Sequence, residues 1–71
     1  MRTINLSKWR RSNPNTSGPR GRGGWLYLVV WRDHINELEE VRCFPGTYTE
    51  SRRAALKYAN KVAAYEIYLM P

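Results

Sequence analysis

Metal-ligating and catalytic side chains are scarce in this chain, which has one cysteine and one histidine among 71 residues. A single cysteine excludes an internal disulfide, and Cys43 with His34 gives too few ligands for a structural zinc site, which takes about four. A catalytic Cys-His pair needs both groups within hydrogen-bond reach, but His34 falls in a predicted hairpin turn and Cys43 is expected to point inward from a strand. We therefore expect no metal, no cofactor and no catalytic residue, and a toxin-like enzyme is disfavoured.

Long apolar runs are also lacking. No stretch approaches the length of about 18 residues that a membrane-spanning helix needs, and the first residues show no signal-peptide pattern. We therefore expect no membrane partner and a cytoplasmic location. A chain this short forms one domain at most and buries only about 60% of its unfolded surface. Its core is expected to need completion by a partner chain, a second copy or a nucleic acid.

Acidic residues are absent up to Arg32, although seven of the twelve basic residues lie there. Residues 12–24 are rich in glycine, proline, serine and asparagine, which favour turns and a flexible backbone. The pattern predicts that residues 1–24 form a basic, largely disordered arm, with a short strand near residues 3–9 as an option. Residues 25–71 are predicted to form the folded domain.

The folded part shows strand and helix periodicities in turn. The wholly apolar stretch 25–31 is typical of a central strand, and residues 38–44 return as a second strand after a turn. Thr47 and Glu50 have the spacing of a capping box before a helix over 51–64. Residues 65–70 then alternate as a last strand, which is expected to lie beside the first. The sequence predicts an α+β domain of β-β-α-β order, with one helix packed on one face of a small three-stranded antiparallel or mixed sheet.

One helix covers only one face of such a sheet, so the other face must be covered by the arm or by a partner. The central strand carries an aromatic stripe on one side and an aliphatic stripe on the other. An aromatic stripe is more often core than a binding platform. If it is the uncovered one, its aromatic residues and the charged residues of the hairpin would form a protein interface. The candidate interface residues are Trp25, Tyr27, Trp31, Glu39, Glu40 and Arg42.

Arginine and tryptophan occur together in the arm. Arginine neutralises phosphates and tryptophan stacks on bases, so the arm is a candidate contact for nucleic acid or an acidic protein surface. Basic residues recur every four positions on the predicted helix, and this row could extend the positive electrostatic field of the arm over the folded domain. The alternatives are a solubilising tail and a solvated helix face. The candidate residues are Lys8, Trp9, Arg10, Arg11, Arg20, Arg22, Arg53, Lys57 and Lys61.

The stretch from Gly46 to Ala59, after a tryptophan-rich strand, resembles the strand-to-helix passage of AP2-type DNA-binding domains and of the arm-binding domains of phage integrases. That resemblance implies a domain that recognises duplex DNA through its sheet and basic arm. In topology and size, residues 25–70 with their basic extension are more similar to small bacteriophage proteins that bind host RNA polymerase and inhibit or antiterminate transcription.

The second resemblance implies a non-enzymatic protein, located in the host-cell cytoplasm, that docks on RNA polymerase or another nucleic-acid-handling complex and regulates transcription. The direct DNA-binding domain is the alternative function, and self-association stays open.

Overall fold

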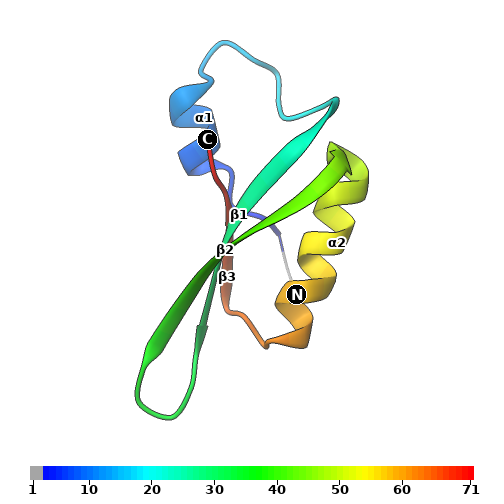
Figure 1. The fold of residues 1–71 in the computed structure, drawn as a ribbon. Coiled ribbons are helices and arrows are strands. Elements are labelled where there is room, and N and C mark those ends of the chain that lie inside the picture. The colour runs from blue at the N-terminus through cyan, green and yellow to red at the C-terminus, as the bar shows by residue number, and fades with distance from the viewer. Residues whose placement is uncertain (1–2) are drawn as a thin grey trace.

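A three-stranded antiparallel sheet organises the chain, which a computed structural model describes over residues 3–71. Residues 1 and 2 of the predicted arm lie outside the described residues. The elements in chain order are α1 (Ser7–Ser12), β1 (Arg22–Arg32), β2 (Glu37–Thr47), α2 (Tyr48–Lys61) and β3 (Glu66–Leu69) (Figure 1). The strand order is β2-β1-β3. The predicted α+β class is confirmed, and so is the position of the last strand beside the first.

The β1–β2 hairpin is longer than the sequence pattern indicated. Its pairing runs from Arg22 opposite Thr47 to Arg32 opposite Glu37. The Asp33 carboxylate accepts hydrogen bonds from the backbone N–H groups that follow it in the turn, at 3.1 and 2.9 Å. This is the local chemistry by which aspartate favours chain reversal. At the other end of the hairpin, both strands continue through the glycine and proline residues at positions 23, 24, 45 and 46, where the composition indicates strand ends.

Helix α2 begins at the predicted capping box. The Thr47 hydroxyl accepts from the Glu50 N–H at 3.2 Å, and the Glu50 carboxylate accepts from the Thr47 N–H at 3.0 Å. The helix turns the small side chains of Ser51, Ala55 and Ala59 toward the sheet, where they are buried. Small residues at these positions allow the helix backbone to approach the sheet closely.

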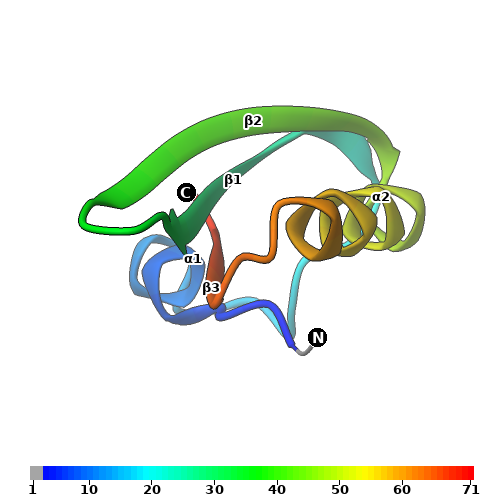
Figure 2. The ribbon, with the colours of Figure 1, turned by 90° about the horizontal axis from the view of Figure 1, so that it is seen from below.

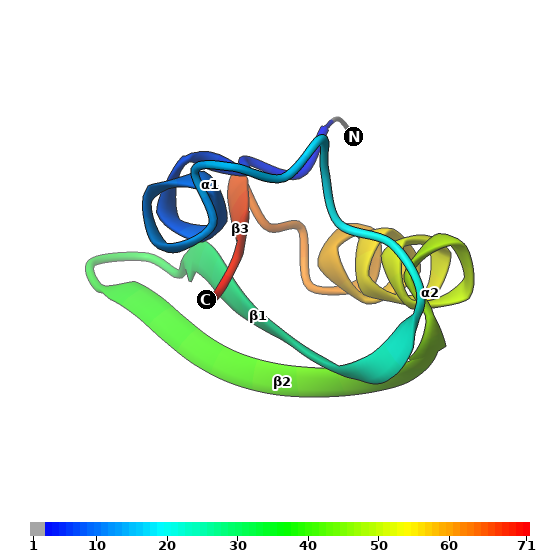
Figure 3. The same cartoon turned by 90° about the horizontal axis from the view of Figure 1, so that it is seen from above.

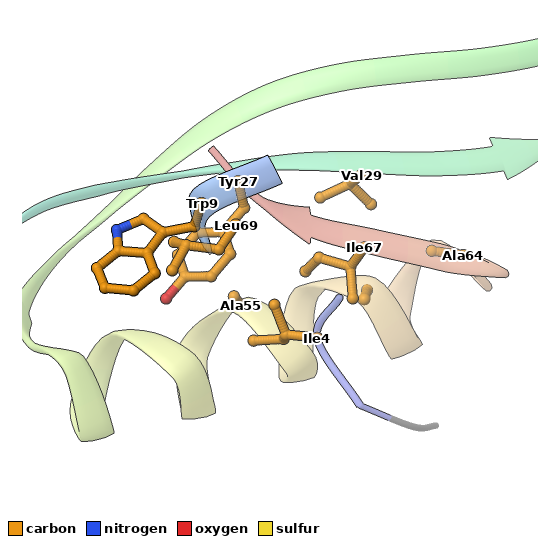
Figure 4. Close-up of a cluster of buried hydrophobic side chains, with 9 residues drawn as sticks. Ile4, Trp9, Tyr27, Val29, Ala55, Ala64, Ile67 and Leu69 are labelled. Atoms are coloured by element: carbon orange, nitrogen blue, oxygen red, sulfur yellow. The ribbon is translucent and has the colours of Figure 1, made fainter. Parts of the chain in front are cut away.

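The N-terminal segment belongs to the core. Ile4 and Trp9 are buried in one cluster with side chains of β1, α2 and β3 (Figure 4). Asn5 donates its backbone N–H to the Ile67 carbonyl at 2.9 Å and accepts from the Leu69 N–H at 3.1 Å, which forms a single parallel bridge at the edge of β3. In place of the strand considered near residues 3–9, the chain makes this bridge and then a six-residue helix. The predicted boundary at residue 24 therefore does not separate a tail from the core.

Both helices lie on the same side of the sheet. Figures 2 and 3 show α1 and α2 on the concave side of the curved β1–β2 hairpin, with β3 between them. Among residues 3–71, nothing forms a layer on the convex side. Of the two kinds of cover expected for the second face, the arm does not supply it, because α1 shares the first face with α2.

Candidate interaction surfaces

The aromatic stripe of β1 faces the helices. Tyr27 is fully buried, and its hydroxyl lies 2.7 Å from the Ser51 hydroxyl of α2. Burial raises the pKa of Tyr27, partly offset by the hydrogen bond to Ser51. Trp25 and Trp31 are half-buried and pack against the core. Tyr27 therefore holds the fold together, and its assignment to an exposed protein interface is corrected.

Glu40 and Arg42 lie on the same helix-covered face and join β2 to α2. Arg42 donates to Glu40 at 3.0 Å. The Tyr58 hydroxyl donates to Glu40, and the Arg42 guanidinium lies 4.5 Å from the centre of the Tyr58 ring. The hydrogen bond from Tyr58 and the neighbouring Arg42 hold the pKa of Glu40 below its usual value. Both side chains therefore have partners within the molecule. Of the six predicted interface residues, only Glu39 lies on the opposite face of the sheet, because it pairs with Val30.

That opposite face, which we call the open face, is aliphatic at its centre. Leu28 stands opposite Val41 on β2 and opposite Tyr68 on β3, and Leu26 stands opposite Cys43. Leu26 is 41% exposed and Val41 is 54% exposed. From Leu26 to Arg32 of β1 and across to the neighbouring strands, the side chains of the open face are Leu26, Leu28, Val30, Arg32, Glu37, Glu39, Val41, Cys43, Glu66 and Tyr68, of which Val30 is buried.

Cys43 is exposed, whereas the sequence pattern had placed it inward. The hairpin register explains the difference, because it sets Cys43 opposite Leu26 on the side away from the helices.

Carboxylates border one end of this aliphatic centre. Glu39 and Glu66 flank Val30 from the two neighbouring strands. Glu37 follows at the turn, where it accepts from the Tyr65 hydroxyl and lies 3.5 Å from Arg32. The hydrogen bond from Tyr65 and the nearby Arg32 lower the pKa of Glu37. The open face is thus an apolar patch bordered by three carboxylates, of which Glu37 is paired with Arg32.

Most of the basic residues among residues 3–71 lie on the two helices. Trp9 is the buried residue of α1, whereas Lys8, Arg10 and Arg11 are exposed. The basic row of α2, formed by Arg53, Lys57 and Lys61, is exposed on the side of the helix away from its buried small residues. Among residues 3–71, the ion pairs join only Arg32 to Glu37 and Arg42 to Glu40. Lys8 lies 5.1 Å from the centre of the Tyr68 ring, and the other exposed cations of the two helices form no ion pair within these residues.

A pocket of about 470 Å³ opens where α1, the following loop and the start of β1 meet. Its lining residues are Trp9, Asn15, Thr16, Ser17, Gly18, Arg20 and Trp25. The structure thus brings together three residues that the sequence had singled out, two indoles and one guanidinium. The loop residues between them were missed, because asparagine, serine and glycine in series have the composition of a linker and carry no sign of a binding role.

No metal site or membrane helix is found in the described part of the chain. No group of three or more histidine, cysteine, aspartate or glutamate side chains within residues 3–71 could hold a metal ion. Within the same residues, no helix has the length and apolar content to cross a membrane. His34 lies exposed in the hairpin turn, and Cys43 pairs with Leu26 near the other end of β2.

Comparison of the chain with family models, with curated proteins and with solved structures finds no match. The two resemblances drawn from the sequence therefore stay predictions, and the function has to be argued from the geometry of these surfaces.

Proposed function

We propose that this protein is a non-enzymatic binding module that docks on a larger nucleic-acid-handling complex through its open face and contacts nucleic acid through its basic residues. The favoured target is the RNA polymerase of a bacterial host, with the chain encoded by a phage and acting in the host cytoplasm to regulate transcription. The observation that carries the proposal is the division of one sheet into a helix-covered side rich in cations and an open side with an acidic border.

The open face has the composition of a protein-docking surface. Exposed aliphatic side chains gathered on one face, with a charged border, are typical of interaction sites in small soluble domains. Leu26 and Val41 supply the exposed aliphatic area, and Glu39 with Glu66 supplies the charge. A complementary partner would offer aliphatic side chains next to lysine or arginine.

The outer edge of β2 adds backbone groups to this surface. β2 is the terminal strand of the sheet and runs over 11 residues. Charged side chains along it, among them Glu37, Glu39 and Arg42, are a usual protection of an edge strand against pairing with its own kind. An edge protected in this way still offers N–H and C=O groups to a partner with complementary charges.

The alternative function, direct reading of duplex DNA by the sheet, fits the open face poorly. Glu39 and Glu66 border the face that would enter a groove, and carboxylates there would repel the phosphates on both sides. Most of the basic residues lie on the helices behind the sheet, and Arg32, which lies on the open face, is paired with Glu37.

Affinity capture from bacterial lysate tests the proposal, carried out with and without nuclease. The wild-type protein is compared with Val41→Glu, which places a charge in the aliphatic centre, and with Thr49→Glu as a matched control. Thr49 is exposed in the first turn of α2, where an added carboxylate suits the helix dipole. Circular dichroism confirms that each variant is folded.

We expect the wild type and Thr49→Glu to retain RNA polymerase subunits after nuclease treatment, and Val41→Glu to lose them. Recovery of nucleic acid alone would contradict the docking function. A sequence-specific preference for duplex DNA at physiological salt would favour the DNA-binding alternative.

A further inference from the structure

The pocket between α1 and β1 combines aromatic, cationic and small polar groups. We propose that it holds one unpaired base of a single-stranded nucleic acid between Trp9 and Trp25, with the adjoining phosphate on Arg20. The inference rests on the proposed contact with nucleic acid and adds to it a defined site and a preference for single strands. The pocket volume of about 470 Å³ falls in the range of small-molecule sites and exceeds what a base alone needs.

The two indoles are fixed before any ligand arrives. Trp25 donates its indole N–H to the Gly46 carbonyl at 3.2 Å and meets the Tyr48 ring edge-on, with centroids 5.1 Å apart. Trp9 is held in the core cluster, as Figure 4 shows. Rings that are already immobilised lose little conformational entropy when a base stacks on them.

The indole N–H of Trp9 remains available to a ligand. Within residues 3–71, it donates to no acceptor, and no buried side-chain nitrogen or oxygen lacks a partner. The Nε1 atom is therefore accessible to solvent and lies on a residue that lines the pocket. It can donate to a base or sugar oxygen, and Asn15 and Ser17 add further hydrogen-bonding groups beside it.

The loop of the pocket is held in shape by its own hydrogen bonds. The Asn13 amide donates to the Trp9 carbonyl at 2.9 Å, and the Thr16 hydroxyl donates to the Asn13 carbonyl at 2.9 Å. These contacts tie the loop to α1, the helix that carries Trp9. The polar wall and the aromatic wall are thus connected.

The charge around the pocket suits a phosphate. Arg20 is exposed and forms no ion pair within residues 3–71. Arg52 follows Tyr48 by four residues on α2, so this exposed second cation lies on the same side of the helix as the ring that supports Trp25. Its positive charge offsets part of the rise that burial causes in the pKa of Tyr48. Glu50 lies in the same region but is engaged in the capping box with Thr47. A phosphate at Arg20 would therefore meet cations and no free carboxylate from α2.

A base-paired duplex cannot use this site without opening, since its bases are stacked and their faces are hidden. Unpaired bases, by contrast, are free to stack on aromatic side chains. The pocket therefore favours single-stranded over duplex nucleic acid, a distinction that a basic tail without a pocket does not make.

Fluorescence titration tests this directly. A Trp31→Phe background leaves the two pocket indoles as the only tryptophans, since the chain has three. The probes are an oligothymidylate of about 20 nucleotides and a hairpin duplex with the same number of phosphates, each titrated over a range of salt concentrations. Arg20→Ala is compared with Arg32→Ala, which removes the same charge from an exposed position at the hairpin turn.

We expect the single strand to quench the indole fluorescence and to bind about tenfold more tightly than the duplex, in line with the stacking of one base. Arg20→Ala should weaken single-strand binding by about tenfold and reduce the salt slope by about one, as the loss of one phosphate contact does. Arg32→Ala should change the affinity less than twofold. Trp25→Phe, which keeps an aromatic ring, should retain part of the binding.

Equal affinity for both probes, binding without quenching, or equal effects of Arg20→Ala and Arg32→Ala would each overturn the pocket proposal. None of these results would affect the docking function, which the capture experiment with Val41→Glu tests separately. Conversely, single-strand binding in a protein that captures no polymerase would support the pocket and reject the docking target.

Discussion

The two faces of the β1–β2 hairpin are built from the same strands but are completed differently. The face with Tyr27 and Val29 is covered by two helices from opposite ends of the sequence, and both side chains are fully buried. The face with Leu26 and Val41 keeps exposed aliphatic side chains and has no covering layer among residues 3–71. The comparison teaches that a small chain can concentrate its buried core on one side of a sheet and leave aliphatic side chains exposed on the other.

The largest expected loss of stability comes from removing the side chain that the N-terminal arm contributes to the core, that of Trp9. Trp9→Ala should destabilise the fold by about 3–5 kcal/mol, because it empties a large site in the core. Thermal or urea unfolding followed by circular dichroism measures this loss. Trp9→Phe should recover a large part of the stability. A stability equal to that of the wild type would mean that the arm is not part of the core.

The next effect concerns the buried hydroxyl pair. Tyr27→Phe leaves the Ser51 hydroxyl without its partner in a buried site, which should cost about 1–3 kcal/mol of unfolding free energy. The double variant Tyr27→Phe/Ser51→Ala should be more stable than Tyr27→Phe alone, since it removes the unpaired group. Urea denaturation of the wild type, the two single variants and the double variant gives the coupling free energy between the two hydroxyls. Losses of unfolding free energy that simply add would contradict this prediction.

A smaller effect is expected from pH on the β2–α2 contact. The pKa of Glu40 is lowered in the folded state by the Tyr58 hydrogen bond and by Arg42, below the reference value of 4.5. The contact therefore stabilises the fold fully above that value and is lost as pH falls through the lowered folded pKa. The unfolding temperature should drop as pH decreases below about 4.5, the reference value for a glutamate carboxyl. The drop should be shallower in Glu40→Gln, and identical pH profiles for the two proteins would contradict the assignment.

The smallest effect is expected on the open face. Val41→Thr keeps the β-branched shape of a side chain that is 54% exposed, so its unfolding free energy should stay within about 0.5 kcal/mol of the wild type. The same variant should weaken capture of the proposed partner, although less than Val41→Glu does. A loss of stability as large as that of Tyr27→Phe would mean that the open face is part of the core.

Local signals in the sequence were sufficient to predict the succession of strands and the capping box of α2, although the helix runs over Tyr48–Lys61 and not over residues 51–64. The apolar stretch from Trp25 to Trp31 has the alternation of a central strand, and the spacing of Thr47 and Glu50 gave the capping box that the structure contains. These features depend on residues near one another in the chain, where pattern and geometry are directly linked.

The choice of covered face could not be predicted in the same way. Both stripes of β1 are apolar, so their periodicity carries no information about which one meets the helix. The decision depends on the hairpin register and on the buried stripe of Ser51, Ala55 and Ala59, which is a tertiary property. Trp9 was assigned to the arm because Lys8 and Arg10 flank it, although burial of a single ring in α1 is compatible with exposed neighbours.

The bridge at Asn5 joins segments more than sixty residues apart, because its partners are Ile67 and Leu69. Contacts of such long range form late and slow the acquisition of the native state, since a large loop has to close first. The same bridge leads directly into α1, and through it to the ring of Trp9. Molecules in which this bridge has not yet formed would lack one wall of the pocket. The proposed binding of a base is therefore expected to appear at the same rate as the completed fold.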